Sequence, residues 1–515
     1  MDGARVRARW WANCSPMERG SCDAGGHGQT LPSQPHDRSC PSRGRRTPRG
    51  SGVTTPDTRA AVHEPWWLSI REVGAAYRRG GLSPVDLTQA LLDRIASFDP
   101  AVGTFLTVTG REALRAAAGA RDELRSGMDR GPLHGIPIGL KDLIDTAGVR
   151  TTAGSRLLAN RVPRRDATVV RRLRAAGAVV LGKQAMTEFA TGAFRNPTFG
   201  ATHNPWRLDR VAGGSSAGSA ASVAAALALG AIGTDTGGSI RGPAALCGVV
   251  GLRPTRGLVP QGGIFPLAPS FDVVGPIART VDGVRLLHEA MTGLGSDGLR
   301  ASERPIDGLR VGVLVGEPWA RLAPAAAEAV ERVTAHLARG GARIVPLVVP
   351  GVADAVIARR TVQYAEAAVV HAPWAERRAD YDPEVLALLD AGRRLRVEDV
   401  AAARQRLRAF RRGVARQLGG LDLVLAATVP CGAWPIDAAT TADGEPAKVA
   451  AIRLTAPITA AGLTAVSLPA GFDGDGLPVA VQLAGLPGSD ALLLTVAEEL
   501  EGALGVVDRR PPGVG

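Results

Sequence analysis

Two short segments rich in glycine and serine hold the residues best suited to covalent chemistry. The first reads AGGSSAGSA over residues 212–220, and the second reads GTDTGGSIRGP over residues 233–243. Glycine pairs leave backbone N–H groups uncovered, and a turn that enters a helix directs several of them to one point. Ser239 follows such a pair and precedes an apolar stretch compatible with a helix. The second segment therefore admits a phosphate-binding loop, a nucleophile beside an oxyanion-binding site, or a plain turn.

Nucleotide-binding and hydrolase patterns fit these two segments poorly. A phosphate loop needs GxxxxGK[ST], but no lysine follows either glycine pair, and neither segment contains the dinucleotide pattern GxGxxG. The sequence GSSAG matches the GxSxG nucleophile elbow, with Ser216 as the nucleophile. That motif also requires a downstream acid and histidine, and His288, His336 and His371 lie in helical or unremarkable contexts. The elbow is therefore the weaker interpretation.

Lysine usage identifies a candidate base. Lysine and arginine together number 61, and only Lys141, Lys183 and Lys448 are lysines. The pKa of a lysine falls readily when it is desolvated, whereas an arginine stays protonated in proteins. Lys141 follows the apolar run IPIGL, where partial burial is expected. It is either a neutral base or a structural lysine paired with Asp142 or Asp145.

The surrounding elements predict an α/β fold. Ser83 can cap a helix that begins with Pro84, and HGIPIGLKDLID reads as a short strand that carries Lys141. A helix, a glycine stop and a strand are predicted for DATVVRRLRAAGAVVLGK. A strand, a helix and a second strand are predicted for LRVGVLV, AAAEAVERVTAHLARGGA and RIVPLVV. Such alternation predicts a mainly parallel or mixed sheet covered by helices.

Composition argues against several classes of protein. The chain is 45% hydrophobic, and its longest apolar run falls well short of the ~20 residues that a membrane span needs. Five cysteines without a CxxC pair support neither a disulfide framework nor a metal site, and they favour a cytoplasmic location. The formal net charge is +12, but ten arginines and only five acids fall within residues 1–60. No basic run follows, so we expect neither a nucleic-acid nor a membrane partner.

Several separated blocks of the sequence resemble the amidase signature family. Residues 213–254, GGSSAGSAASVAAALALGAIGTDTGGSIRGPAALCGVVGLRP, are similar to the segment that defines this family. GIPIGLKDLIDTAGVRTTAGS, LGKQAMTEFA, NPWRLDRVAGGSS, FPLAPSFDVVGPIART and GLPVAVQLAGLPG resemble its other blocks, in order. The resemblance runs from about residue 67 to residue 501. It implies an α/β fold with one large domain, built on a mixed sheet.

The resemblance also implies a catalytic apparatus. Ser239 matches the family's nucleophile, Ser215 the bridging serine, and Lys141 the base. The Gly214–Ser215 peptide bond is then expected to be cis, and Ser216 to be a supporting hydrogen-bonding neighbour. The family requires no cofactor and no metal.

The remaining matched positions surround the nucleophile. Arg241 matches a scaffold residue rather than a substrate clamp. The oxyanion hole corresponds to the backbone amides of Thr236, Gly237, Gly238 and Ser239.

The resemblance favours a stand-alone amidase that converts a small-molecule amide to a carboxylate plus ammonia or an amine. The alternative is the glutaminase subunit of a tRNA-dependent Glu/Asp amidotransferase. Residues 307–429 are expected to build pocket walls, where Tyr364, Trp374 and Tyr381 are either pocket aromatics or packing residues. The oligomeric state is open, with a homodimer as one alternative.

The expected domain organisation has three parts. Residues 1–60 are rich in Arg, Pro, Ser and Gly and predict a disordered extension. Residues 61–505 form the amidase signature domain, and residues 506–515 form a flexible tail. Within the domain, the polar residues 296–305 resemble a linker.

Overall fold

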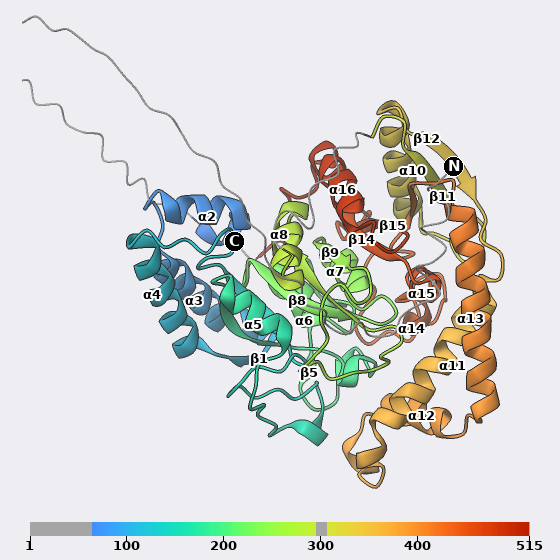
Figure 1. Cartoon of the computed structure of the whole chain (residues 1–515), viewed down its shortest axis with the longest axis horizontal. Coiled ribbons are helices and arrows are strands. Elements are labelled where there is room, and N and C mark those ends of the chain that lie inside the picture. The colour runs from blue at the N-terminus through green and yellow to red at the C-terminus, as the bar shows by residue number, and fades with distance from the viewer. Residues whose placement is uncertain (1–63, 295–305, 514–515) are drawn as a thin grey trace, which may run out of the picture. The chain divides into compact units, whose positions relative to one another are not determined.

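The computed structural model describes residues 64–294 and 306–513, and its centre is an 11-stranded β-sheet (Figure 1). The extension predicted for residues 1–60 and the linker predicted for residues 296–305 lie outside the described residues. Across the sheet, the strands follow in the order β1 (Phe105–Val108), β3 (Val179–Gln184), β2 (Pro137–Lys141), β8 (Gly230–Asp235), β10 (Val273–Ala278), β9 (Val250–Arg253), β14 (Thr464–Phe472), β15 (Pro478–Gly485), β13 (Leu423–Ala427), β11 (Arg310–Leu314) and β12 (Arg343–Leu347).

The sheet is mixed, as the sequence predicted. Strand β2 runs parallel to both β3 and β8, and β11 runs parallel to both β12 and β13. The strands between these two groups pair in antiparallel fashion. Two small two-stranded sheets pair β4 (Arg195–Asn196) with β5 (Gly200–Ala201) and β6 (His203–Asn204) with β7 (Arg207–Val211).

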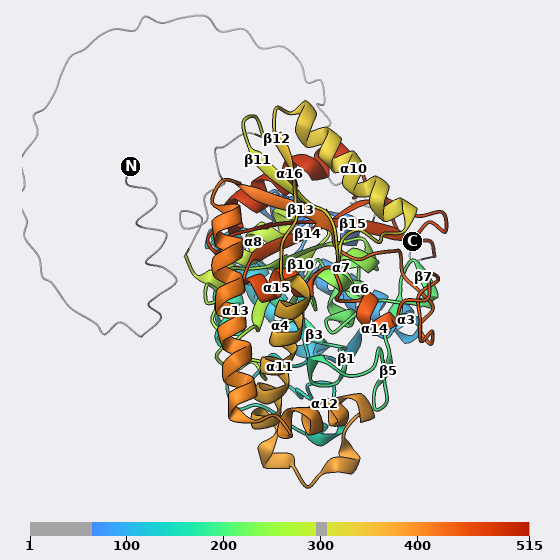
Figure 2. The same ribbon diagram turned by 90° about the vertical axis from the view of Figure 1, so that its right-hand side faces the viewer.

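Helices cover both faces of the large sheet (Figures 1 and 2). On β8, a Cβ at Gly230 would meet Leu287 of α8, whereas a Cβ at Gly233 would meet Ser216 just before α6. Because strand residues three apart face opposite sides, α6 and α8 lie on opposite faces. The helices are α2 (Ile70–Arg78), α3 (Pro84–Val102), α4 (Gly110–Arg125), α5 (Thr168–Ala175), α6 (Ala217–Ala224), α7 (Arg241–Cys247), α8 (Val281–Thr292), α10 (Pro324–Arg339), α11 (Val352–Val370), α12 (Pro383–Arg393), α13 (Val397–Leu418), α14 (Ala447–Ala450), α15 (Ala456–Ala461) and α16 (Asp490–Leu504).

Local sequence signals predicted several of these elements correctly. Helix α3 begins at Pro84, and Ser83 caps it by accepting a hydrogen bond from Val85 N at 3.2 Å. The predicted strand that carries Lys141 is β2, and the helix and strand that follow are α5 and β3.

The alanine-rich run ASVAAALALG, residues 221–230, is helical only over its first residues. Helix α6 ends at Ala224, Ala226 adopts a left-handed φ of 51°, and Gly230 already begins β8. The sequence gives no sign of this turn, because alanine has a high helix propensity. Packing against the sheet overrides that propensity here.

Helix α11 packs on both α12 and α13, as Figure 2 shows, and the three helices lie between β12 and β13 in the chain. Helix α11 also packs on α15. This arrangement brings the segment between β12 and β13 close to residues that follow β8. The segment thereby forms one wall of the site described below. In the described parts of the chain, no helix is both long and apolar enough to cross a membrane.

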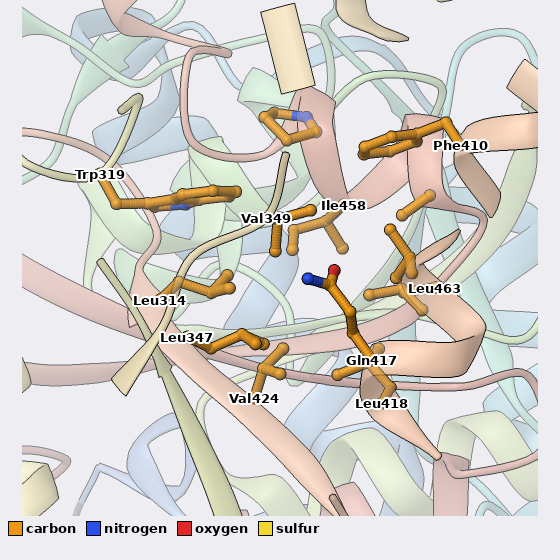
Figure 3. A pocket seen from close by; sticks show the side chains of 13 residues that line it. Leu314, Trp319, Leu347, Val349, Phe410, Gln417, Leu418, Val424, Ile458 and Leu463 are labelled. Atoms are coloured by element: carbon orange, nitrogen blue, oxygen red, sulfur yellow. The ribbon is translucent and has the colours of Figure 1, made fainter. Parts of the chain in front are cut away.

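A small apolar cavity lies between β11, α13 and α15 (Figure 3). Its volume is about 20 Å³, and Trp319, Phe410, Gln417 and Ile458 are among its lining residues. A space of this size holds about one water molecule. It is therefore a gap in core packing and not a site for a substrate.

Candidate active site

Two neighbouring parallel strands bring the chemically active segments together. Strand β2 ends at Lys141, and β8 runs beside it with Ile232 opposite Leu140. The carboxyl ends of both strands therefore meet at one edge, where α/β sheets commonly bind ligands. Helix α6 packs on β2 and β8, which places the residues just before it, including Ser215, beside Lys141.

Lys141 is completely buried within a cage of hydroxyl groups. Its Nζ donates hydrogen bonds to Ser215 Oγ at 2.7 Å, Thr234 Oγ1 at 2.8 Å and Ser216 Oγ at 3.0 Å. Burial lowers the pKa of Lys141 to about 7, although Asp235 and Asp272 partly oppose this change. A neutral amine has two N–H donors and one lone pair, and hydroxyl groups can satisfy all three because they both donate and accept. The cage therefore suits a lysine that gains and loses a proton near neutral pH.

The three candidate serines occupy different positions. Ser215 and Ser239 both line one cavity, and the Gly214–Ser215 peptide bond is cis, as predicted. Within the described residues, Ser239 Oγ makes no hydrogen bond with Ser215 or Lys141. Ser216 is completely buried, and its Oγ bonds the backbone of Thr234. Since a substrate carbonyl cannot reach a buried hydroxyl, the geometry does not favour the GxSxG interpretation.

The loop after β8 packs so closely against the side chain of Thr455 that it needs glycine. Gly238 adopts a φ of +136°, and a Cβ there would lie only 2.0 Å from Thr455 Oγ1. Gly238 N donates to Asp235 Oδ1 at 2.9 Å. Within the described residues, no hydrogen bond occupies the amides of Thr236, Gly237 and Ser239. Three of the four amides expected for the oxyanion hole are thus unoccupied, while that of Gly238 supports the loop.

The buried carboxylate of Asp235 holds this loop in place through ion pairs and hydrogen bonds. The carboxylate pairs with Arg241 Nε at 3.0 Å and with Arg253 Nη1 at 3.1 Å. Burial alone would raise the pKa of Asp235, but the two guanidinium groups hold it well below its usual range. Arg241 is fully buried and also donates to Gln482 Oε1 and Thr455 O. Arg241 thus lies beneath the loop, away from the cavity.

Sequence reasoning missed several supporting residues. Thr234 contacts Lys141, Asp272 accepts a hydrogen bond from Thr236 Oγ1 at 2.6 Å, and Thr455 Oγ1 donates to Gly237 O at 2.8 Å. Asp235 and Arg253 could have been noticed as charged residues at the ends of predominantly apolar stretches. Nothing in the local sequence distinguishes Thr455.

Ser239 opens into a cavity of about 470 Å³. Its lining includes Ser215, Thr236 and Gly237, together with Arg359 and Tyr364 of α11. Tyr364 is therefore a pocket residue.

The other two candidate aromatics lie elsewhere. Trp374 and Tyr381 pack around His371, with ring centroids 6.0 and 5.5 Å from the imidazole. They therefore serve as packing residues.

Comparisons with known proteins identify related sequences and structures. The family model described as Amidase matches residues 86–494. A crystal structure of an amidase superposes with a TM-score of 0.79 at 32% sequence identity, over 85% of this chain and 100% of that chain. The native peptide amidase from Stenotrophomonas maltophilia gives a TM-score of 0.76 at 32% identity, over 87% of this chain and 98% of that chain.

Among curated proteins, the A subunit of the glutamyl-tRNA(Gln) amidotransferase from Roseiflexus sp. strain RS-1 is 47% identical over 258 residues. That alignment covers 48% of this chain, and the chain spans about half (53%) of the length of that relative. The chain therefore belongs to the amidase signature family, and it is a hydrolase that acts on amide bonds.

Proposed function

We propose that the chain is a free-standing amidase that hydrolyses a carboxylic amide through an acyl-enzyme on Ser239. The observation that carries this proposal is the buried Lys141, whose amine contacts Ser215 and whose pKa burial lowers to about 7. A base with a pKa near the operating pH is well suited to general acid–base catalysis.

The proposed reaction begins when neutral Lys141 accepts the proton of Ser215, which in turn accepts the proton of Ser239. Ser239 Oγ then forms a bond to the amide carbonyl carbon. The unoccupied amides of Thr236, Gly237 and Ser239 stabilise the tetrahedral oxyanion, a contribution of about 3 kcal/mol for one donor.

Collapse of the intermediate breaks the carbon–nitrogen bond, Ser215 gives a proton to the departing nitrogen, and Lys141 returns its proton to Ser215. The product amine or ammonia then departs, and the acyl group remains bound to Ser239 as an ester. Water then attacks this ester, releases the carboxylate and restores the Ser239 hydroxyl. All proton transfers use groups that line the cavity or the cage beneath it.

A second candidate function is that of the glutaminase subunit in a tRNA-dependent amidotransferase. The observation in its favour is the 47% identity to a subunit of such an enzyme. A glutaminase of this kind is expected to work only with partner chains and an aminoacyl-tRNA. The free-standing function is preferred because the solved amidases align over 98 to 100% of their own length.

The nucleophile can be tested without knowledge of the substrate. The native protein, Ser239→Ala and Ser216→Ala are each treated with a fluorophosphonate, and the adduct is located by peptide mass spectrometry. We expect an adduct on Ser239 in the native protein and in Ser216→Ala, and none in Ser239→Ala. An adduct on Ser216 would contradict the assignment.

Release of ammonia distinguishes the two candidate functions. We expect the purified chain to release ammonia from simple amides without any added protein. Activity that appears only with partner chains and tRNA would favour the amidotransferase.

A further inference from the structure

Arg359 is a buried cation in the cavity wall. Its side chain belongs to α11 and is 3% exposed, and its Nη1 donates to Gln363 Oε1 at 2.6 Å and to Thr236 O at 3.4 Å. Nε is buried without a hydrogen-bond partner, and Nη2 has no acceptor among the described residues. One edge of the guanidinium, made by Nε and Nη2, thus lacks an acceptor.

The other buried arginines nearby are paired. Arg241 and Arg253 both contact the carboxylate of Asp235, whereas no carboxylate in the described part of the chain lies within 4.0 Å of Arg359. The ring of Phe271, with its centroid 6.0 Å from Cζ, provides only a weak cation–π contact. Because a buried cation without an anion is costly, a bound anion would offset that cost.

The unused edge has the geometry that binds carboxylates elsewhere in this protein. Arg78 donates from Nε and Nη2 to the two oxygens of Asp129, at 2.7 and 2.9 Å. Such two-point pairs are stronger and more directional than single hydrogen bonds. The equivalent edge of Arg359 is therefore suited to a carboxylate supplied by a ligand.

Arg359 lies directly against the proposed oxyanion loop. A Cβ at Gly237 would be 3.3 Å from Arg359 Nη1. Arg360 and Lys448 also line the cavity, and its one lining carboxylate, Glu384, lies 2.8 Å from Lys448 Nζ. The cavity therefore carries an excess of positive charge, which attracts anionic ligands.

We infer that the substrate is an amide whose acyl part carries a carboxylate, and that Arg359 binds this carboxylate while the amide carbonyl occupies the loop beside Ser239. The contact between Arg359 and Gly237 requires a short spacer between the two groups. Monoamides of small dicarboxylic acids meet these requirements. This inference rests on the proposed amidase function, because it names the substrate class of the same site.

The kinetic test compares anionic amides with uncharged amides of the same shape. Succinamate is paired with 4-methylpentanamide, and glutaramate with 5-methylhexanamide, so that an isopropyl group replaces each carboxylate. We expect the native protein to prefer at least one anionic partner by about ten- to hundredfold in kcat/KM. Arg359→Met should abolish this preference mainly through KM, and Arg359→Lys should restore part of it.

The control variant is Arg406→Met, which removes an exposed arginine of α13 that does not line the cavity. We expect it to keep the native preference. Equal rates for the paired amides in the native protein would overturn the inference. An equal loss for both partners in Arg359→Met would overturn it as well, since Arg359 would then act on the reaction and not on the carboxylate.

A binding test separates this inference from the proposed reaction. Calorimetry measures the binding of succinate and glutarate to the native protein, Arg359→Met and Arg406→Met. We expect Arg359→Met alone to bind about tenfold or more weakly. If the chain hydrolyses no amide but shows this dependence, the amidase proposal fails and the anion site stands. If it hydrolyses neutral amides and binds neither dicarboxylate, the anion site fails and the amidase proposal stands.

Discussion

Two fully buried lysines lie on adjacent strands of the sheet, in different surroundings. Lys141 ends β2 inside a cage of three hydroxyl groups. Lys183 lies on β3 opposite Leu140, with its Nζ 3.7 Å from Asp142 Oδ1. It also donates to the backbone oxygen of Ile144 and to a threonine hydroxyl.

The difference shows how neighbours decide the task of a buried amine. Burial lowers the pKa of Lys141 to about 7 and that of Lys183 to about 8, where Asp142 gives the largest opposing effect. A carboxylate partner favours the charged lysine, whereas hydroxyl groups accommodate either protonation state. Lys141 is therefore suited to proton transfer, and Lys183 to a structural ion pair.

The largest predicted effect is the loss of activity on replacement of Lys141. Lys141→Met removes the base while keeping most of the buried volume. We expect kcat to fall by about 10²- to 10⁴-fold, the usual contribution of general acid–base catalysis. Amide hydrolysis and circular dichroism of the same preparation provide the measurement. A folded Lys141→Met protein with nearly native kcat would show that Lys141 is no base.

Replacement of Lys183 should instead lower stability. Lys183→Met leaves the buried carboxylate of Asp142 without its cation, which costs about 3–5 kcal/mol in the free energy of unfolding. Urea denaturation measures this loss, and the folded fraction should keep its activity. The double variant Lys183→Met with Asp142→Asn should recover much of the stability. A double variant as unstable as the single one would contradict the pairing.

The pH dependence should distinguish the same two lysines. With a pKa of about 7 for Lys141, we expect the rate to fall about tenfold per pH unit below pH 7 and to reach a plateau above it. The profile should keep this midpoint in Lys183→Met. If the midpoint of the pH–rate profile changed in Lys183→Met, the titrating group would be Lys183 and not Lys141.

Stability should also follow the titration of Lys141. The unfolded lysine keeps a pKa near 10.5, so between about pH 7 and 10.5 the unfolded state holds a proton that the native state lacks. The contribution of Lys141 to the free energy of unfolding therefore rises with pH across this window. Comparison of the native protein with Lys141→Met by urea denaturation isolates this contribution.

The smallest predicted effects come from single hydroxyl groups. Thr234→Val removes one partner of Lys141, and Thr151→Val removes the hydroxyl that binds Lys183 at 2.8 Å. Each should lower the free energy of unfolding by about 1 kcal/mol. Only Thr234→Val should also lower kcat, by several-fold. Equal effects of the two variants on kcat would contradict the different roles of Lys141 and Lys183.

Much of the fold and of the candidate site could be predicted where the signals are local. Ser83 and Pro84 marked the start of α3, and the strand before Lys141 followed from its apolar run. The turn after α6 was not predicted, because an alanine-rich run is helical by propensity and becomes a turn only when packed on the sheet. The hydrogen bond from Gly238 N to Asp235 was not predicted either, since only the folded loop brings the two groups together.

The sequence by itself determined the reactive residue types and their local backbone. Ser239 and Ser215 lie in glycine loops whose conformations need glycine, and Lys141 lies in an apolar strand that forces its burial. Tertiary structure alone decided their partners. Thr234 reaches Lys141 because β8 pairs with β2, and Arg359 reaches Gly237 because α11 packs over a loop formed much earlier in the chain. Such contacts depend on strand register and helix packing, which are properties of the whole core and leave no pattern in neighbouring residues.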